Sequence, residues 1–367
     1  MKKTVIVFGG DTCEHDISIV TAFLVKENFV KNKTPHLFVY LGRDGVFYYG
    51  AALDKKENYS SLKGFKKGYF KRENKKTYFV KGIKKEEVKD VLLCVHGEGM
   101  EDGTLGAFFD ILKVPVSYVG VESASIIQNK YLTKLVLSEN EIPVTKSLKL
   151  DQKTYKNQHF NIECLLKDFS FPLILKPLHL GSSIGVYKCE NNDEINSHLV
   201  TLFNLDNEVL IEECITSLKE YNIAVVGDER EVFVSLIEEV NHEDRVLSFI
   251  DKYEEFSSSN EKQIPANIDS SLHQEIEALA IKSFNILKCN GVVRFDFLYD
   301  SNNKKLYLNE VNSIPGSLAY YLFEGKGMSF KELIERILDS AKYRLYLKNK
   351  KITTYEGSNL LKIGAKK

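Results

Sequence analysis

Two polar side chains near the end of the sequence follow an apolar strand and have the types and spacing of cation ligands. The stretch LYLNEVNSIPGSLAYY, residues 306–321, begins as an apolar strand and then places Glu310 and Asn312 two residues apart. Because alternate residues of a strand point to the same face, Leu306 and Leu308 are expected to share a face with Glu310 and Asn312. This face would turn from apolar to polar where the strand ends.

A second strand is expected just upstream, with the sequence VVRFDFLYD over residues 292–300. The turn-forming residues SNNK between the two strands indicate a β-hairpin. If their polar faces coincide, Asp296 joins Glu310 and Asn312 in an oxygen-rich cluster with Arg294 beside it. Such a cluster suits Mg²⁺, which keeps several waters and binds through one or two carboxylates together with substrate phosphates. A solvent-facing hairpin with ordinary surface charge would have the same sequence, so both interpretations stand.

The composition excludes several classes of function. A chain of 367 residues suggests two or three domains. It has 50 Lys and Arg residues against 51 Asp and Glu residues, so its net charge of −1 offers no general attraction for nucleic acid or membrane, and small-molecule partners are expected. The first apolar run is too short for a signal peptide, and no run approaches a membrane span, which predicts a cytoplasmic protein. The six cysteines have no CxxC spacing and are expected to be reduced and mostly buried.

The hydrophobic pattern predicts a chain of α/β and α+β parts. In residues 1–120 the strands TVIVFGG, HLFVYLG and DVLLCVHG alternate with helical patterns, which predicts a parallel α/β domain that binds ligands at the carboxyl ends of its strands. Residues 121–215 have an α+β pattern. Residues 216–345 hold another strand, a polar loop, a helix and the hairpin. Residues 346–367 are rich in lysine and are expected to form a flexible tail.

A loop of small residues follows a lysine at the end of another strand. In FPLILKPLHLGSSIGV, Lys176 ends an apolar run and precedes a Gly-Ser-Ser-Ile-Gly loop. Small residues let backbone amides approach an anion, and lysine supplies a compact positive charge for phosphates. A simple turn would explain the glycines and serines, but it would not explain the lysine, because lysine is seldom buried without a partner. Phosphate binding is therefore the favoured interpretation, although this is not a Walker A loop.

Three further stretches give weaker signals. In EVLIEECI and the segment after it, Glu212 and Glu220 could bind an adenine amino group and ribose hydroxyls, or could simply lie at a solvated strand end. In FGGDTCEHD, Glu14 stands at an expected helix start, but the GxGxxG pattern of a dinucleotide loop is absent, which argues against a nicotinamide enzyme. Lys252 and Tyr253 precede a polar loop that could be an active-site lid or an ordinary surface loop.

Six stretches, in this order, resemble the ATP-grasp superfamily and, within it, the D-alanine:D-alanine ligases of peptidoglycan synthesis. The resemblance covers residues 3–340, through FGGDTCEHDIS, VHGEGMEDGT, SIIQNKYLTK, KPLHLGSSIGV, RFDFLYD and NEVNSIPG. It implies an N-terminal substrate-binding domain followed by a two-lobed ATP-grasp fold. The implied reaction uses ATP to turn one amino acid into an acyl phosphate, which the amine of a second amino acid attacks. Two Mg²⁺ ions, for which Mn²⁺ could substitute, and a homodimer are also implied.

The resemblance implies roles for matching residues. Those expected to contact ATP are Lys130, Lys176, Ser183, Glu212, the backbone near Ile215, Glu220 and Lys252. Those expected to hold the metal ions are Asp296, Glu310 and Asn312. Those expected to bind the amino acids are Glu14, His96, Tyr321 and Leu322. Those expected to act in catalysis are the hydrogen-bonded trio Glu14, Ser182 and Tyr253, together with an oxyanion site formed by Arg294 and the amide of Gly316.

The sequence departs from the family pattern at two positions. Tyr321 stands where family members have a serine that binds the acceptor's carboxylate, and Asn129 stands where an aspartate is usual. A tyrosine hydroxyl can also donate a hydrogen bond but reaches further from the backbone, so Tyr320 and Tyr321 leave the acceptor open. Either a small backbone shift lets D-alanine bind, or the enzyme joins a different pair. Tyr253 at the lid position resembles the amide-forming ligases. A nucleotide-binding protein without activity is the remaining alternative.

Overall fold

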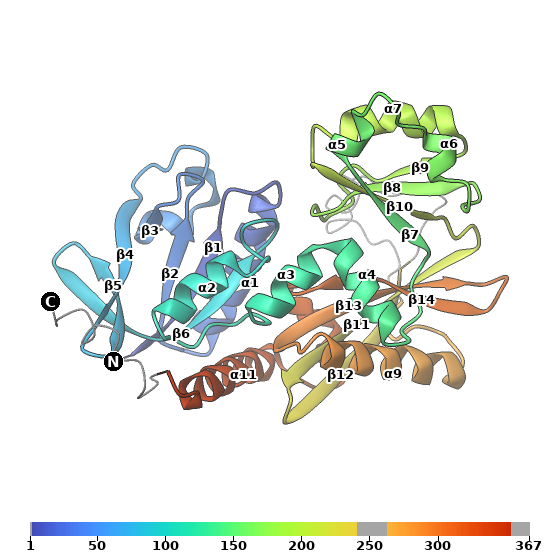
Figure 1. Ribbon diagram of the computed structural model, residues 1–367. Coiled ribbons are helices and arrows are strands. Elements are labelled where there is room, and N and C mark those ends of the chain that lie inside the picture. The colour runs from blue at the N-terminus through green and yellow to red at the C-terminus, as the bar shows by residue number, and fades with distance from the viewer. Residues whose placement is uncertain (1, 241–262, 354–367) are drawn as a thin grey trace, which may run out of the picture.

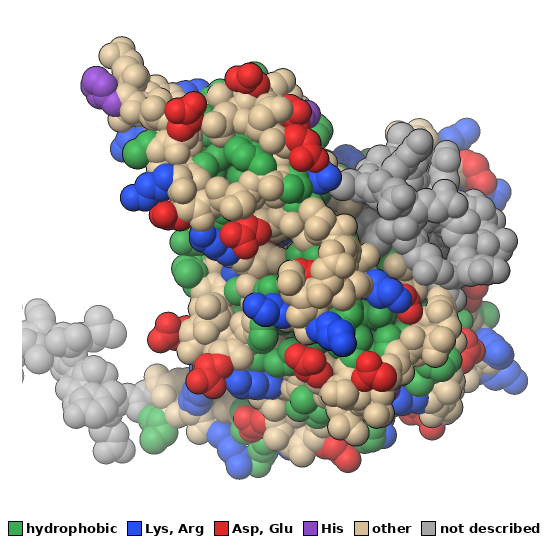
Figure 2. All heavy atoms as spheres, turned by 90° about the vertical axis from the view of Figure 1, so that its right-hand side faces the viewer, with side chains coloured by type: hydrophobic (Ala, Val, Ile, Leu, Met, Phe, Trp, Pro, Cys, Tyr) green, Lys and Arg blue, Asp and Glu red, His purple; other side chains and the backbone are tan. Residues whose placement is uncertain are grey.

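The computed structural model describes residues 2–240 and 263–353, which form three sheets with their helices (Figure 1). Lys252 and Tyr253, expected in a lid, lie outside these ranges. In Figure 1 the first sheet lies to the left, a small lobe lies at the upper right, and the third sheet lies below that lobe. Figure 2 shows the small lobe as a distinct mass above the rest, with acidic and basic side chains scattered over this face. No helix among the described residues is long and apolar enough to cross a membrane.

The first sheet closes into a six-stranded barrel. Its strands are β1 (Lys3–Gly9), β2 (His36–Leu41), β3 (Phe47–Tyr49), β4 (Lys66–Glu73), β5 (Lys76–Lys81) and β6 (Lys84–Val95). β1 runs parallel to β2 and β6, as predicted, and its apolar run is buried, as is usual for a central parallel strand. Helices α1 (His15–Lys31) and α2 (Thr104–Ile111) follow β1 and β6.

The prediction of a purely parallel N-terminal sheet is wrong for the segment between β2 and β6. Here β3, β4 and β5 pair antiparallel, with only the short turns η1 (Ala51–Asp54) and η2 (Lys56–Asn58) between β3 and β4. The β4–β5 connection is a tight hairpin because Asn74 and Lys75 both adopt positive φ, at 49° and 63°. Without a long crossover helix, consecutive strands in one sheet can only run antiparallel.

The small lobe is a four-stranded antiparallel sheet with its own core. Its strands, in the order β7-β10-β8-β9, are β7 (Ser147–Asp151), β10 (Glu208–Glu213), β8 (Leu173–Pro177) and β9 (Tyr187–Cys189). Helices α5 (Gln152–Tyr155), α6 (Ile162–Leu165) and α7 (Asn192–Leu202) lie above the sheet in Figure 1. Inward-facing strand residues pack with the apolar face of α7 in a cluster separate from the main core. The two helices α3 (Val121–Gln128) and α4 (Lys130–Glu139) precede this lobe.

The third sheet has the order β12-β11-β13-β14. Its strands are β11 (Leu218–Asp228), β12 (Glu231–Val240), β13 (Gly291–Asp300) and β14 (Lys305–Asn312). Helix α9 (Ser270–Ile286) lies beneath it in Figure 1, and helix α11 (Phe330–Lys350) lies to its lower left, below the first sheet. η3 (Gly316–Ala319) and α10 (Tyr320–Glu324) follow β14. This sheet shares a continuous core with the first sheet.

The predicted hairpin is present, but a β-bulge changes which side chains share a face. β13 and β14 pair with Asp296 opposite Glu310 and Phe297 opposite Leu308, so Asn309 is an extra residue in β14. Leu308 therefore faces the core while Glu310 and Asn312 face away from it with Asp296. The expectation that Leu306 and Leu308 share a face with Glu310 and Asn312 is wrong, because strict alternation ends at the bulge.

The C-terminal helix extends further than expected. α11 continues to Lys350, so residues 346–350 are helical rather than part of a tail beginning at residue 346. Its last turns are anchored to the N-terminal part, because Arg344 and Lys348 both form ion pairs with the buried Asp110, at 3.0 and 3.4 Å. All six cysteines are free, and only three of them are buried, fewer than expected.

Candidate active site

Two cavities meet between the small lobe and the third sheet. The smaller, of about 400 Å³, is lined by residues of β8, β10 and β14 and by the loop after β10, and the larger, of about 790 Å³, reaches from the start of α1 to Tyr321. Both volumes are typical of small-molecule sites. Five residues line both cavities: Lys130, Gly181, Glu220, Asp296 and Glu310. Two of the three residues expected to bind metal therefore lie where the cavities join.

The third sheet brings the predicted oxygen-rich cluster together. Arg294 donates two hydrogen bonds to Asp296, at 2.7 and 2.8 Å, and the side-chain amide of Asn312 donates a third at 2.9 Å. Burial raises the pKa of Asp296; Arg294 opposes this shift, and the charges of Glu220 and Glu310 add to it. Cross-strand pairing of Arg294 with Asn312 and of Asp296 with Glu310 explains why these four side chains share one face.

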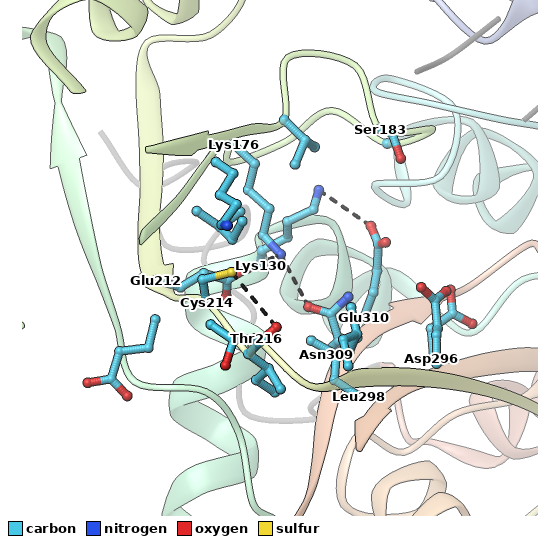
Figure 3. Close-up of a pocket in the computed structure, with 18 of the residues that line it drawn as sticks. Lys130, Lys176, Ser183, Glu212, Cys214, Thr216, Asp296, Leu298, Asn309 and Glu310 are labelled. Atoms are coloured by element: carbon cyan, nitrogen blue, oxygen red, sulfur yellow. Dashed lines mark hydrogen bonds and ion pairs between the residues drawn. The ribbon is translucent and has the colours of Figure 1, made fainter. Parts of the chain in front are cut away.

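Two lysines reach this cluster from the other side of the smaller cavity (Figure 3). Lys130 Nζ, at the start of α4, lies 3.6 Å from a carboxylate oxygen of Glu310. Lys176 Nζ, at the end of β8, donates to the side-chain oxygen of the bulge residue Asn309 at 3.3 Å. The bulge thus places neighbouring side chains, Asn309 and Glu310, within reach of the two lysines predicted to bind phosphate. Asn129 caps α4 by accepting from Leu132 at 2.9 Å, which an aspartate could do equally well.

Glu212, which was expected to contact ATP, forms an ion pair with Lys176. On β8 and β10, Lys176 lies opposite Leu210, so Glu212 two residues further on shares its face. Glu212 holds Lys176 Nζ at 2.5 Å and Lys134 Nζ at 3.0 Å, and it accepts from Thr145 at 3.0 Å. Burial favours the neutral acid, but the two ammonium groups outweigh it and lower the pKa of Glu212 to about 2.

Sequence reasoning missed Lys134 and Thr145 in this network. Lys134 lies four residues after Lys130, so one helical turn aligns the two on neighbouring parts of α4. That spacing is the only signal that the sequence offers. Burial lowers the pKa of Lys134, and Glu212 opposes that shift. Ser183, Ile215 and Glu220, all expected to contact ATP, line the smaller cavity.

The Gly-Ser-Ser loop brings the small lobe against the start of α1. Ser182 donates a hydrogen bond to a carboxylate oxygen of Glu14, so two members of the expected trio are in contact. Ser182 and Ser183 adopt positive φ, at 55° and 58°, a sparsely populated conformation that recurs at functional sites. A Cβ atom at position 181 would lie 3.2 Å from both oxygens of Glu14, so glycine allows this close approach.

The N-terminal part contributes a buried polar wall to the larger cavity. His96 Nε2 lies 3.1 Å from Thr21 Oγ1, and burial, together with the charge of Arg294, lowers the pKa of His96 to about 4. His96 is therefore neutral near pH 7 and forms no ion pair with Glu101, 4.0 Å away. Glu101 accepts from the amides of Gly97 and Ile314 at 2.7 and 3.2 Å, and burial and the nearby Glu14 raise its pKa. Glu101 lies in the VHGEGMEDGT stretch, but it was not predicted to be a site residue.

The turn after β14 carries the remaining expected residues. Gly316 lines the larger cavity, and Ser317, Leu318 and Ala319 then adopt left-handed conformations, with φ between 51° and 53°. The amide of Ser317 donates to Thr21 Oγ1 at 3.1 Å, which ties this turn to α1. These residues turn the chain sharply before α10, at a conformational cost that the surrounding contacts must offset.

Tyr321 and Leu322, the last two residues of the predicted acceptor site, lie in different surroundings. Tyr321 lines the larger cavity, and its hydroxyl donates to Glu238 Oε2 at 3.1 Å. Asn222 donates to the same oxygen at 3.2 Å. Leu322 has no exposed surface and its side chain packs in the core, so it is not part of the cavity wall, and its expected role in substrate binding stays a prediction. Glu238 was not predicted, because its partner is distant in sequence.

In a comparison with known proteins, the two halves of the chain match the two models of one protein family. The family model "D-ala D-ala ligase N-terminus" matches residues 3–121, and "D-ala D-ala ligase C-terminus" matches residues 136–339. The D-alanine–D-alanine ligase of Thermosipho melanesiensis is 34% identical over 98% of this chain and 98% of its own length.

Solved structures agree in fold. The D-alanine-D-alanine ligase from Coxiella burnetii superposes with a TM-score of 0.80 at 22% identity, covering 95% of this chain and 96% of that one. The VanG D-Ala:D-Ser ligase from Enterococcus faecalis superposes with a TM-score of 0.76 at 25% identity, covering 93% and 99%. The α/β fold class with an N-terminal domain and ATP-grasp lobes is thereby confirmed. The chain belongs to the D-alanine–D-alanine ligase family of ATP-dependent, ATP-grasp ligases.

Proposed function

We propose that this chain joins two molecules of D-alanine into the dipeptide while ATP is converted to ADP and phosphate. The observation that carries the proposal is the shared wall of the two cavities, where Lys130, Glu220, Asp296 and Glu310 face both spaces. A nucleotide in the smaller cavity would have its γ-phosphate beside an amino acid in the larger one. Phosphoryl transfer depends on such positioning and on electrostatic stabilisation.

The smaller cavity fits the nucleotide. Lys130 and Lys176 would contact the phosphates from the small-lobe side, and the backbone amides of the loop at Ser183 would approach them closely. Ile215 and Glu220, which also line this cavity, would face the base and the ribose. Lys252, outside the described residues, would join the phosphates from the lid segment.

The residues expected to bind metal fit hard cations. No group of three or more His, Cys, Asp or Glu side chains among the described residues could hold a metal by itself, so the set depends on Asp296, Glu310 and the amide oxygen of Asn312, together with nucleotide phosphates. All of these donors are oxygens, which Mg²⁺ prefers. We assign two ions to this set. When bound, they offset the negative charge of the phosphates during transfer.

The chain's own residues would then position the two amino acids in the larger cavity. Glu14 would hold the ammonium of the first D-alanine, whose carboxylate oxygen attacks the γ-phosphorus of ATP and releases ADP. The amine of the second D-alanine, after losing a proton, attacks the carbonyl carbon of this acyl phosphate. Arg294 and the amide of Gly316 would donate to the resulting oxyanion, which collapses and expels phosphate. Ser182, with Tyr253 from the undescribed segment, would orient Glu14 and the acceptor.

A different acceptor is the second candidate function. Tyr321 stands where a serine is usual, and its hydroxyl donates to Glu238, which also lines the larger cavity, so the acceptor end of this cavity includes a carboxylate. An acceptor with a donor on its side chain, such as D-serine, could use that carboxylate. The similarity to the VanG D-Ala:D-Ser ligase makes this acceptor worth testing.

The test is Mg²⁺-dependent phosphate release from ATP with D- and L-amino acids, singly and in pairs, and with products identified by mass spectrometry. We expect D-alanine alone to give the dipeptide. Formation of another pair would keep the chemistry and change the substrate, and ATP binding without turnover would indicate a nucleotide-binding protein.

We also propose that the enzyme works in the cytoplasm as a homodimer in peptidoglycan synthesis. Light scattering that gives the mass of one chain would contradict the dimer.

A further inference from the structure

Three consecutive side chains at the junction of α3 and α4 bind the residues that lead into the Gly-Ser-Ser loop. Gln128 donates to the backbone carbonyl of His179 at 2.6 Å, and Lys130 donates to the carbonyl of Leu180. Between them, the side-chain nitrogen of Asn129 lies 3.3 Å from Nε2 of the His179 ring. Because α4 lies below the small lobe in Figure 1, these contacts hold the loop of the lobe against the helix that carries Lys130.

The hydrogen bonds of Asn129 determine the protonation state of the ring that it contacts. Its side-chain oxygen accepts from the amide of Leu132 at 2.9 Å, so its nitrogen is the atom that faces Nε2 of His179. An amide nitrogen only donates, and Nε2 accepts only when it carries no proton. The other ring nitrogen, Nδ1, then donates to Asp206 at 3.1 Å. The arrangement therefore requires a neutral imidazole.

We propose that Gln128 and Asn129 are positioning residues for nucleotide binding, and that Asn129 holds the Gly-Ser-Ser loop in place through the neutral ring of His179. This inference rests on the proposed contacts of Lys130 and of the loop at Ser183 with the phosphates of ATP. It also gives a reason for one of the two departures from the family pattern. An aspartate at position 129 could cap α4 but could not donate to Nε2.

The charged groups around the ring favour its protonated form, so the contact with Asn129 is sensitive to pH. These groups are Asp206 and Glu208, just before and at the start of β10, and Glu98, after β6. The hydrogen bond to Asp206 raises the pKa of His179; burial opposes this shift, and the charges of all three carboxylates add to it. When the ring takes up a second proton, Nε2 becomes a donor that faces the amide donor of Asn129. This contact is then lost, while the bond to Asp206 remains.

Replacing Asn129 with serine removes the contact and keeps the cap, because serine is also a favoured N-cap residue but its side chain is too short to reach the ring. Dissociation constants for ATP with Mg²⁺, without amino acids, are measured by calorimetry at about pH 9 and about pH 5, on either side of the range in which histidine titrates. At the higher pH we expect Asn129→Ser to bind ATP about two- to tenfold more weakly than the wild type, the usual contribution of one hydrogen bond. At the lower pH the two proteins should bind ATP equally, since the contact is lost in both. Comparing the two proteins at one pH cancels the direct effect of the histidine charge on the nucleotide.

Two other variants sharpen the test. Asn129→Asp should show the opposite pH dependence, because a carboxylate accepts from the protonated Nε2 and holds the loop at low pH. It should also raise the pKa of His179, which is read from the NMR titration of the ring protons without nucleotide. Gln128→Met should weaken ATP binding at both pH values, because the backbone carbonyl that Gln128 contacts does not titrate.

Asn140→Ser is the matched control. Asn140 is exposed at the other end of α4, where its side chain donates to the carbonyl of Val136 at 2.8 Å, so this change should leave ATP binding unaltered at both pH values.

The inference would be overturned if Asn129→Ser changed ATP affinity by the same factor at both pH values, or if Asn129→Asp left the pKa of His179 unchanged. Normal affinity in Gln128→Met would overturn the role of Gln128. A wild-type chain that did not bind ATP would refute the proposed function, and the pKa of His179, measured without nucleotide, would still decide whether Asn129 contacts the ring.

Discussion

Replacing Arg294 with lysine tests whether its planar fork, and not only its charge, is needed in the larger cavity. Arg294 donates to both oxygens of Asp296, at 2.7 and 2.8 Å, and its side chain is 22% exposed toward the cavity. Lysine keeps the positive charge but cannot form this bidentate contact. The lysine ammonium would have to donate either to Asp296 or to the developing oxyanion.

The expected loss follows from the contacts that lysine cannot make. Losing one hydrogen bond to a charged group costs about 1.5–3 kcal/mol. At about 1.4 kcal/mol per tenfold in rate, this corresponds to a kcat lower by roughly tenfold to a hundredfold. Removing an oxyanion donor in other enzymes has a comparable or larger effect, about 10²–10³ in kcat. We therefore expect kcat to fall about a hundredfold, while the KM for ATP changes little because Arg294 does not line the nucleotide cavity.

The assay is coupled ADP release with saturating D-alanine, with thermal unfolding measured to show that the variant is folded. Arg230→Lys is the matched control. Arg230 forms the same two-bond fork with Asp228, at 2.9 and 2.7 Å, but it lies outside both active-site cavities. A kcat for Arg294→Lys within threefold of wild type, or an equal loss in Arg230→Lys, would refute the reasoning.

Three further predictions concern other parts of the site. Glu310→Gln should abolish ATP turnover and leave thermal unfolding near that of the wild type, because an amide binds Mg²⁺ less well than a carboxylate; near-normal turnover would exclude the metal role. Tyr321→Ser should lower the KM for D-alanine as acceptor by restoring the shorter side chain, and an unchanged or higher KM would count against that model of the acceptor pocket. Because the lysines lower the pKa of Glu212 from 4.5 to about 2, the folded state resists its protonation, so the free energy of unfolding should decrease as the pH falls from about 4.5 to about 2. Each pKa unit corresponds to about 1.4 kcal/mol, and acid unfolding curves of Glu212→Gln without a smaller pH dependence would contradict this.

The sequence predicted the active-site hairpin because its signals are local. Glu310 and Asn312 stand at the end of β14 and Asp296 lies on β13, and the turn residues between the two strands indicate the hairpin whose pairing brings the three together. The bulge at Asn309 could not be predicted, because nothing in the alternation of LYLNEVN marks an extra residue. It arises from how β14 pairs with β13, and it decides which face Glu310 occupies.

The residues that were missed have partners far away in the chain. Lys134 meets Glu212 across 78 positions of sequence, and Glu238 meets Tyr321 across 83. The packing of α4 against the small lobe and of α10 against the third sheet creates these contacts. The burial of the Leu322 side chain could not be predicted either, because a motif position gives no information on whether a side chain faces a cavity or the core.

The most direct test of the central claim, that ATP and the first amino acid meet at the wall shared by the two cavities, follows one oxygen atom. D-Alanine labelled with ¹⁸O in both carboxylate oxygens is incubated with the enzyme, Mg²⁺ and ATP, and the released phosphate is analysed by mass spectrometry. If the carboxylate attacks the γ-phosphorus and the acyl phosphate is then opened by the second amine, each phosphate released should contain one ¹⁸O. Unlabelled phosphate, released at the rate of ATP consumption, would show that water and not the amino acid accepts the phosphoryl group, and would contradict the account.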